Sequence, residues 1–182
     1  MWLKGRENLK MLLERLEENG CQAVVCGGLE GLYSNLDLIQ NRFEIGSAAF
    51  YPRGRLKSLP SRLSGRIVQV NNDMAAADLA GFKLAITEFD YALAESGSLV
   101  IFTESMVERL VTCLPETLLG VVWADRILPS LTSHHSIIAA NVADGKVVSI
   151  ISGPSKTLDI EQTFVTGVHG PDRVMALIVV EE

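Results

Sequence analysis

Glu95 is the first residue in the chain whose type and position suggest chemistry. Ser96, Gly97 and Ser98 follow it, and a serine–glycine pair is typical of a tight turn between two strands. A carboxylate beside such a turn can act as a general base, or as a nucleophile towards an activated acyl group. The alternative is a structural carboxylate that accepts hydrogen bonds from the backbone of its own turn. Ser96 does not fit a hydrolase nucleophile, because position 94 is alanine where the G-x-S-x-G turn needs glycine.

A second segment, residues 152–162, has the composition of an anion-binding loop. Its glycine allows backbone amides to approach a ligand, and its lysine adds a positive charge, but the segment lacks the Walker spacing. Asp159 and Glu161 are two positions apart and point in different directions, so they cannot chelate one ion alone. The alternative is a strand followed by a capped helix. The candidate ligand-binding residues here are Gly153, Pro154, Ser155, Lys156, Thr157, Asp159 and Glu161.

His169 lies between two glycines with a proline behind them, so the loop confines its imidazole. Such a side chain can exchange protons near neutral pH, although a lone histidine can also be structural. His134 and His135 are adjacent and point in different directions. We therefore take Glu95 and His169 as candidate catalytic residues. Ser96, Gly97, Ser98 and Gly170 complete the candidate ligand-binding set.

The charge of the chain argues against a nucleic-acid partner. It has 16 Lys plus Arg against 22 Asp plus Glu, a net charge of −6, and an acidic surface repels a phosphate backbone. The basic residues that do cluster lie in a stretch rich in Pro, Gly and Ser. This pattern favours a solvated loop and leaves an anion or phosphate site as the alternative. The cluster consists of Arg53, Arg55, Lys57, Arg62 and Arg66.

Three cysteines, Cys21, Cys26 and Cys113, form no CxxC pair. Structural zinc and iron–sulfur clusters normally need about four ligands, so we expect no metal or cofactor on this chain and any redox centre in a partner. The turn at Gly27-Gly28 lacks the G-x-G-x-x-G of a dinucleotide site. No signal peptide or membrane-spanning apolar run is visible, so we expect a cytoplasmic protein without a membrane partner. The oligomeric state stays open, a homo-oligomer included.

The hydrophobic pattern predicts one α/β domain over residues 1–182. Buried strands interleaved with helices favour a mostly parallel sheet flanked by helices, with an antiparallel hairpin at Ser96-Gly97. Ligands of such sheets bind beyond the carboxyl ends of the strands, where we expect the three candidate loops. Expected helices are 7–19 (within an N-terminal segment 1–20), 29–43, 74–81 capped by Asp73, 104–112, 129–141 and 160–166 capped by Asp159. Expected strands are 22–26, 66–70, 83–95, 98–102, 118–123, 146–151 and 174–180, with a loop at 46–65.

Two runs of the sequence resemble the signatures of the LUD-domain family. The first is Phe89-Asp90-Tyr91-Ala92-Leu93-Ala94-Glu95-Ser96-Gly97-Ser98-Leu99-Val100, and the second is residues 152–162 followed by Gly167-Val168-His169-Gly170-Pro171. The resemblance implies a fold similar to the sugar-phosphate isomerase and CoA-transferase (NagB/RpiA/CoA-transferase-like) group. The sequence of this chain departs from the family pattern at three positions. Ser96 replaces Thr, Lys156 replaces Arg and Leu158 replaces Ala.

The resemblance is to lactate-utilisation proteins of the C type. It implies a component of L-lactate oxidation to pyruvate that works with iron–sulfur partner proteins and binds a small carboxylate or phosphorylated ligand. Two alternatives remain. One is an independent enzyme on a CoA ester or phosphosugar, with Glu95 as nucleophile or base. The other is a non-catalytic regulatory module that binds a carboxylate.

Overall fold

The computed structural model describes residues 2–42, 46–57, 66–158, 164–166 and 170–181. Its centre is a six-stranded sheet in the order β1-β12-β7-β4-β2-β3, in which every neighbouring pair is parallel. The strands are β1 (Gln22–Gly27), β2 (Ser47–Tyr51), β3 (Arg66–Gln69), β4 (Leu84–Glu88), β7 (Thr117–Trp123) and β12 (Arg173–Val180). This arrangement confirms the expected fold class.

Strand β7 lies inside the sheet because it is apolar along its whole length. All seven of its residues are buried, as is typical of a parallel strand covered on both faces. Successive side chains point to opposite faces. Leu119 and Val121 therefore pack in one core cluster, whereas Leu118 and Val122 pack in another.

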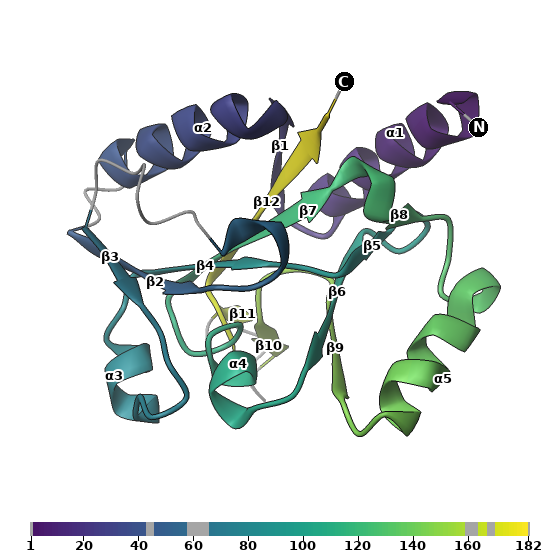
Figure 1. The fold of residues 1–182 in the computed structure, drawn as a ribbon. Coiled ribbons are helices and arrows are strands. Elements are labelled where there is room, and N and C mark those ends of the chain that lie inside the picture. Colours follow the sequence, from purple (N-terminus) through teal and green to yellow (C-terminus); the bar gives the residue numbers. More distant parts are fainter. Residues whose placement is uncertain (1, 43–45, 58–65, 159–163, 167–169, 182) are drawn as a thin grey trace.

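Helices cover both faces of the central sheet (Figure 1). On one face, α2 buries Leu32 and Leu36 against β7 and β12. On the other face, α1 buries Leu12 and Leu16 beside a second sheet, and two short helices cover the end near β2 and β4. The helices are α1 (Trp2–Glu18), α2 (Gly28–Arg42), α3 (Ala76–Ala80), α4 (Met106–Leu110) and α5 (His135–Ala143).

The second sheet has the order β8-β5-β6-β9. The predicted hairpin is present as β5 and β6, joined by residues 94–97, but its first strand is shorter than expected. Residues 84–88 belong to the central sheet as β4, so the expected strand 83–95 is two strands in different sheets. Helix α5 packs on the outer side of this second sheet. The strands are β5 (Tyr91–Leu93), β6 (Ser98–Thr103), β8 (Ile127–Leu128) and β9 (Val147–Ile151).

Two expected segments near the middle of the chain differ from the structure, one in kind and one in its start and cap. The loop predicted at 46–65 contains β2, whose Ala48, Ala49 and Phe50 are buried, and a 3-10 turn at Gly54–Leu56. The helix predicted at 74–81 begins at Ala76 and has no side-chain cap. Asp73 instead donates its backbone N–H to Asn71 Oδ1 at 3.0 Å, which keeps this part of the chain in a turn.

Two expected helices near the carboxyl-terminal end also differ. The helix predicted at 129–141 starts later, because Pro129 follows β8 and a 3-10 turn (Thr132–His134) precedes α5. Within the helix predicted at 160–166, Phe164–Thr166 is strand β11, which pairs antiparallel with β10 (Lys156–Leu158). Its proposed cap, Asp159, lies outside the described residues.

We expect the hairpin turn to be sensitive to a methyl group at Gly97. This residue has φ +61°, and a Cβ there would lie 2.6 Å from the backbone carbonyl carbon of Arg15. Gly145 is a matched control, because it has φ +83° with nothing within 4 Å of the same atom. Gly97→Ala should lower the free energy of unfolding by about 2–4 kcal/mol, since overpacking adds to the backbone cost. Gly145→Ala should cost about 1 kcal/mol.

Urea unfolding followed by circular dichroism measures both losses. Equal losses for the two variants would contradict the contact between the turn and α1.

Candidate functional site

The candidate loops lie at the amino-terminal edge of the central sheet. Asn19 precedes β1, and its side-chain amide donates to the carbonyl groups of Ser96 at 2.8 Å and Gly97 at 3.2 Å. The amide of Ser155 donates at 3.1 Å to the carbonyl of Pro171, which shortly precedes β12. Ligands of parallel sheets commonly bind at the carboxyl edge. That expected location is therefore wrong for these loops.

A row of three serine hydroxyl groups joins the two signature segments. Ser98 Oγ lies 2.8 Å from Ser96 Oγ and 2.8 Å from Ser152 Oγ. The strand register explains the contact, because Leu99 of β6 pairs with Ile151 of β9 and so brings the flanking serines together. Ser98 is buried, and its hydroxyl can donate to one neighbour while it accepts from the other.

A pocket of about 320 Å³ opens beside this row, between the end of α4, the end of β9 and the loops. Arg109 of α4 lines it and is half-buried. Among the described residues Arg109 has no carboxylate partner, and its Nη2 contacts Met106 Sδ at 3.5 Å. A guanidinium group without a carboxylate is suited to bind a carboxylate or phosphate. The hydroxyl-bearing residues of the pocket are Thr112, Ser149, Ser152 and Ser155.

Cys113 also lines this pocket, but its environment does not favour a nucleophile. Burial raises the pKa of the Cys113 thiol above its usual value. The thiol donates to the carbonyl groups of Arg109 and Leu110 at 3.6 Å each. A thiol of this kind stays protonated at neutral pH and reacts slowly.

Of the two candidate catalytic residues, the structure describes only Glu95. Glu95 is exposed, does not line the pocket, and donates its backbone N–H to the Pro129 carbonyl at 2.9 Å. The pKa of Arg15 is raised mainly by Glu18, with a smaller contribution from Glu95, which places the Glu95 carboxylate near the end of α1. His169 lies outside the described residues.

The remaining candidate ligand residues divide into three groups. Gly153 and Gly170 line the pocket with Ser155, and a Cβ on Gly153 would lie 2.6 Å from the Asn19 carbonyl oxygen. Pro154 lies in the same loop and is half-buried. Lys156 and Thr157 belong to β10, whereas Asp159 and Glu161 lie outside the described residues.

The carboxyl edge of the sheet carries a group of paired charges, of which the sequence analysis singled out only Arg53, as part of the basic cluster. Arg53 follows β2 and Asp90 follows β4. Arg53 Nη2 donates to both Asp90 oxygens, at 3.0 and 2.9 Å, and to the Phe102 carbonyl at 3.1 Å. Its Nη1 lies 3.4 Å from Glu108 Oε1. The sequence offered one further signal for this group: Asp90 belongs to the first signature and lies two residues after the buried strand β4.

Arg55 is held in a neighbouring ion-pair group. Its guanidinium lies 4.6 Å from the centre of the Trp123 ring, 2.6 Å from Asp125 Oδ2 and 3.2 Å from Glu181 Oε2. The interpretation of the basic cluster as a solvated loop is therefore wrong for Arg53, whereas Arg55 is exposed. Arg62 lies outside the described residues, and Arg66 begins β3.

A polar pocket of about 460 Å³ lies next to Arg53, and Lys57 and Lys146 line it. Lys146 pairs with Glu104 at 3.5 Å, and Arg53 is already shared between two carboxylates. Much of the positive charge at this edge is thus neutralised within the protein. An anionic ligand would have to compete with these pairs, which makes this pocket less suited to a carboxylate than the one at Arg109.

Glu88 is another buried carboxylate of this edge. It is 9% exposed and accepts the backbone N–H groups of Arg55 at 2.7 Å and Leu56 at 3.0 Å. Burial raises the pKa of Glu88, and the two amides oppose that shift only in part. Desolvation disfavours the charged form of a carboxyl group, so the net direction is upward.

The described residues contain no group of three or more His, Cys, Asp or Glu side chains placed to hold a metal ion. They also contain no helix with the length and apolar character needed to cross a membrane.

The chain is similar in sequence to one protein-family model and to several proteins of known name. A family model described as the LUD domain matches residues 6–179. The chain is similar to lactate utilization protein C of Bacillus licheniformis, with 39% identity over 103 residues, and of Bacillus subtilis, with 38% over 100 residues. These matches cover 54% and 53% of this chain. They cover 42% of each relative, so the matched region is less than half the length of those proteins.

A solved structure supports the fold. The chain is similar to a DUF162 family protein from Deinococcus radiodurans, with a TM-score of 0.72 and 19% sequence identity. The superposition covers 96% of this chain and 98% of that one. At this identity the likeness concerns the fold alone.

We expect Glu88→Gln to change how stability depends on pH. The folded-state pKa of Glu88 is raised, so its contribution is fully present below the unfolded-state pKa of about 4.3 and is lost as pH rises through the raised folded pKa. Glutamine does not titrate. The stability of the variant relative to wild type should therefore increase between pH 4 and pH 7, by about 1.4 kcal/mol per unit of pKa shift.

Urea unfolding of both proteins across this pH range measures the difference. Glu17→Gln, at an exposed position of α1, controls for the loss of one negative charge. A difference between Glu88→Gln and wild type that does not vary with pH would contradict the prediction.

Proposed function

This chain belongs to the LUD domain family, and on that premise we propose that it takes part in L-lactate utilisation, as a carboxylate-binding component that works with iron–sulfur partner proteins. The observation that carries the proposal is its similarity to relatives named lactate utilization protein C, at 38% to 40% identity over about 100 residues. Those relatives are longer than the matched region, so their partners and activity come to this chain as proposals.

The pocket at the amino edge is the proposed ligand site. Lactate and pyruvate both carry a carboxylate, which Arg109 can bind with two parallel N–H···O bonds. The second oxygen function of either molecule needs a hydroxyl or amide partner, and Ser152 and Ser155 line the same pocket. Thr112 adds a hydroxyl from α4.

The chemistry of lactate oxidation sets what partners must supply. Conversion of lactate to pyruvate releases two electrons and two protons. Three cysteines are too few for the four thiolate ligands that a typical iron–sulfur cluster takes, so we propose that partner proteins carry the electron acceptors. His169 directly precedes the pocket residue Gly170, and we propose its imidazole as the acceptor of the hydroxyl proton. Because Glu95 does not line this pocket, we propose that the second proton passes with the electrons to the partner proteins.

We expect Arg109→Gln to abolish binding of lactate or pyruvate. At about 100 times the dissociation constant, a bound ligand adds about 2.7 kcal/mol to stability, which gives a clear thermal shift. Arg109→Lys should bind more weakly than wild type, because lysine lacks the bidentate geometry. Arg126→Gln removes the same charge at an exposed position outside the pocket and should keep the shift.

Titration calorimetry with lactate and with pyruvate measures the affinity of wild type and of each variant, and so tests the assignment of this site. Wild-type affinity retained in Arg109→Gln would overturn the assignment of this pocket. Loss of affinity in Arg126→Gln as well would show a general charge effect instead.

We expect the chain to form a complex with iron–sulfur proteins and to support lactate-dependent reduction of their clusters. Anaerobic mixing with lactate should bleach the cluster absorbance, and omission of this chain should slow the bleaching at least tenfold. A chain that stays separate from such proteins on gel filtration, and that changes no cluster reduction rate, contradicts the proposal. Saturable binding without any turnover would favour the carboxylate-binding regulatory module.

A further inference from the structure

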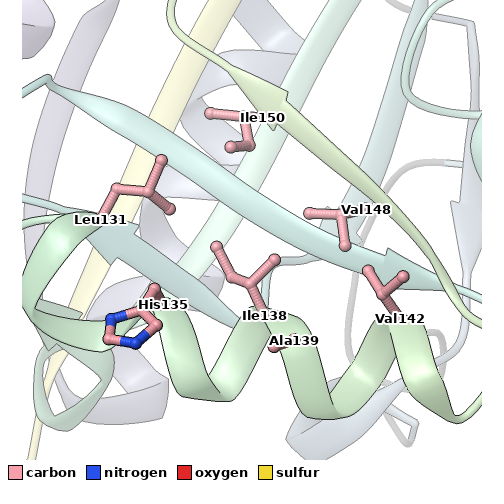
Figure 2. Close-up of a pocket in the computed structure, with 7 residues that line it drawn as sticks. All are labelled: Leu131, His135, Ile138, Ala139, Val142, Val148 and Ile150. Atoms are coloured by element: carbon pink, nitrogen blue, oxygen red, sulfur yellow. The ribbon is translucent and has the colours of Figure 1, made fainter.

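The outer surface formed by α5 and β9 is apolar (Figure 2). Ile138 and Val142 of the helix point towards the sheet, where Val148 and Ile150 of β9 line the other side of a groove of about 510 Å³. The apolar side chains around this groove are unusually open to water. Leu131 is 42% exposed, Val142 53% and Ile150 44%.

This surface also lacks charge. No Asp, Glu, Lys or Arg occurs between Arg126 and Asp144, although such residues make up 21% of the chain. Helix α5 has no buried residue, yet most of its side chains are apolar. A helix at a water-facing surface normally carries a polar face with charged residues. The composition of α5 therefore indicates that another surface covers it.

Strand β9 adds an open backbone edge to this surface. It pairs with β6 and, among the described strands, with no other. Its sequence, Val-Val-Ser-Ile-Ile, has high β-propensity. It contains no proline or charged residue of the kind that protects exposed edges. The N–H and C=O groups along its free side are available to another strand.

We propose that a second copy of this chain covers the surface, with β9 pairing antiparallel to the same strand of the partner across a twofold axis. Two copies of a chain with net charge −6 repel each other, and an uncharged surface is where they can approach at the least electrostatic cost. Antiparallel pairing of one strand with itself is self-complementary, as a twofold interface requires. The pairing would join the two four-stranded sheets into one continuous sheet.

The strand length fixes the centre of the pairing. Ser149 is the middle residue of β9, so the twofold axis passes beside it. Val148 and Ile150 of one copy then lie across from Ile150 and Val148 of the other, on the side that carries α5. The apolar groove of each copy thereby meets the groove of its partner.

Analytical ultracentrifugation tests the proposal with three variants. The wild-type chain of 19.8 kDa should sediment with twice that mass at micromolar concentration. Ile150→Lys and Val142→Glu should each raise the dimer dissociation constant at least about tenfold, because each places a charge in the interface. Both positions are exposed, so the monomer should still fold. Leu38→Lys, at a residue of α2 that is 65% exposed, should stay dimeric.

Cysteine cross-linking tests the register. Ser149→Cys should form an interchain disulfide under mild oxidation, because the two Cα atoms would lie about 5 Å apart. Val147→Cys should not, because the two copies of residue 147 would lie about 14 Å apart. The unmodified chain, with its three native cysteines, is the blank for both.

Several outcomes would overturn the proposal. They are a monomeric wild type, a dimer that both interface variants leave unchanged, and a cross-link at Val147→Cys rather than Ser149→Cys. A monomer that binds phospholipid vesicles through Ile150 and Val142 would assign the surface to a membrane. Val142 lies outside the ligand pocket, so detectable lactate binding by Val142→Glu separates this test from that of the proposed function.

Discussion

The parallel central sheet must be covered on both faces, and the remaining elements follow from that requirement. Its strands β7 and β12 are buried along almost their whole length, so exposed faces would place a large apolar area in water. Helix α2 covers one face. On the other, α1 and the short helices leave room that β5 and β6 fill. These strands form a sheet with an outer face of its own, which α5 covers in turn. Among the described residues, nothing covers the outer side of α5.

The amino edge is organised by contacts at the end of α1. Asn19 holds the hairpin turn, and the close approach of Gly153 to the Asn19 carbonyl brings the second signature to the same place. The two edges then differ in charge. Buried charges require partners, and at the carboxyl edge Arg53 and Asp90 supply them to each other. Arg109 follows Glu108 directly on α4, and the described residues supply it with no carboxylate partner.

Sequence reasoning predicted the elements whose pattern is local. The leucine spacing of α1 is compatible only with a helix, and the short apolar run of β7 indicates a buried strand. Strand β2 was missed because Ser47–Tyr51 is short, contains two alanines and is followed by proline. The apolar stretch 83–95 gave no sign of its division between two sheets. The predicted ligand loops partly line one pocket, but Arg109 was not found, since its importance depends on which carboxylates are absent around it, and only tertiary structure decides that.

Strand β9 connects the two proposals physically. Its outer side chains, Val148 and Ile150, belong to the apolar groove, and Ser152 and Gly153 follow its last residue into the ligand pocket. An edge strand bonded on one side opens more readily than a strand bonded on both. Pairing with a second copy would therefore hold β9 more firmly and restrict the loop that carries Ser152. A pocket restricted before the ligand arrives loses less conformational entropy on binding, so a dimer would bind a small carboxylate more tightly than the monomer.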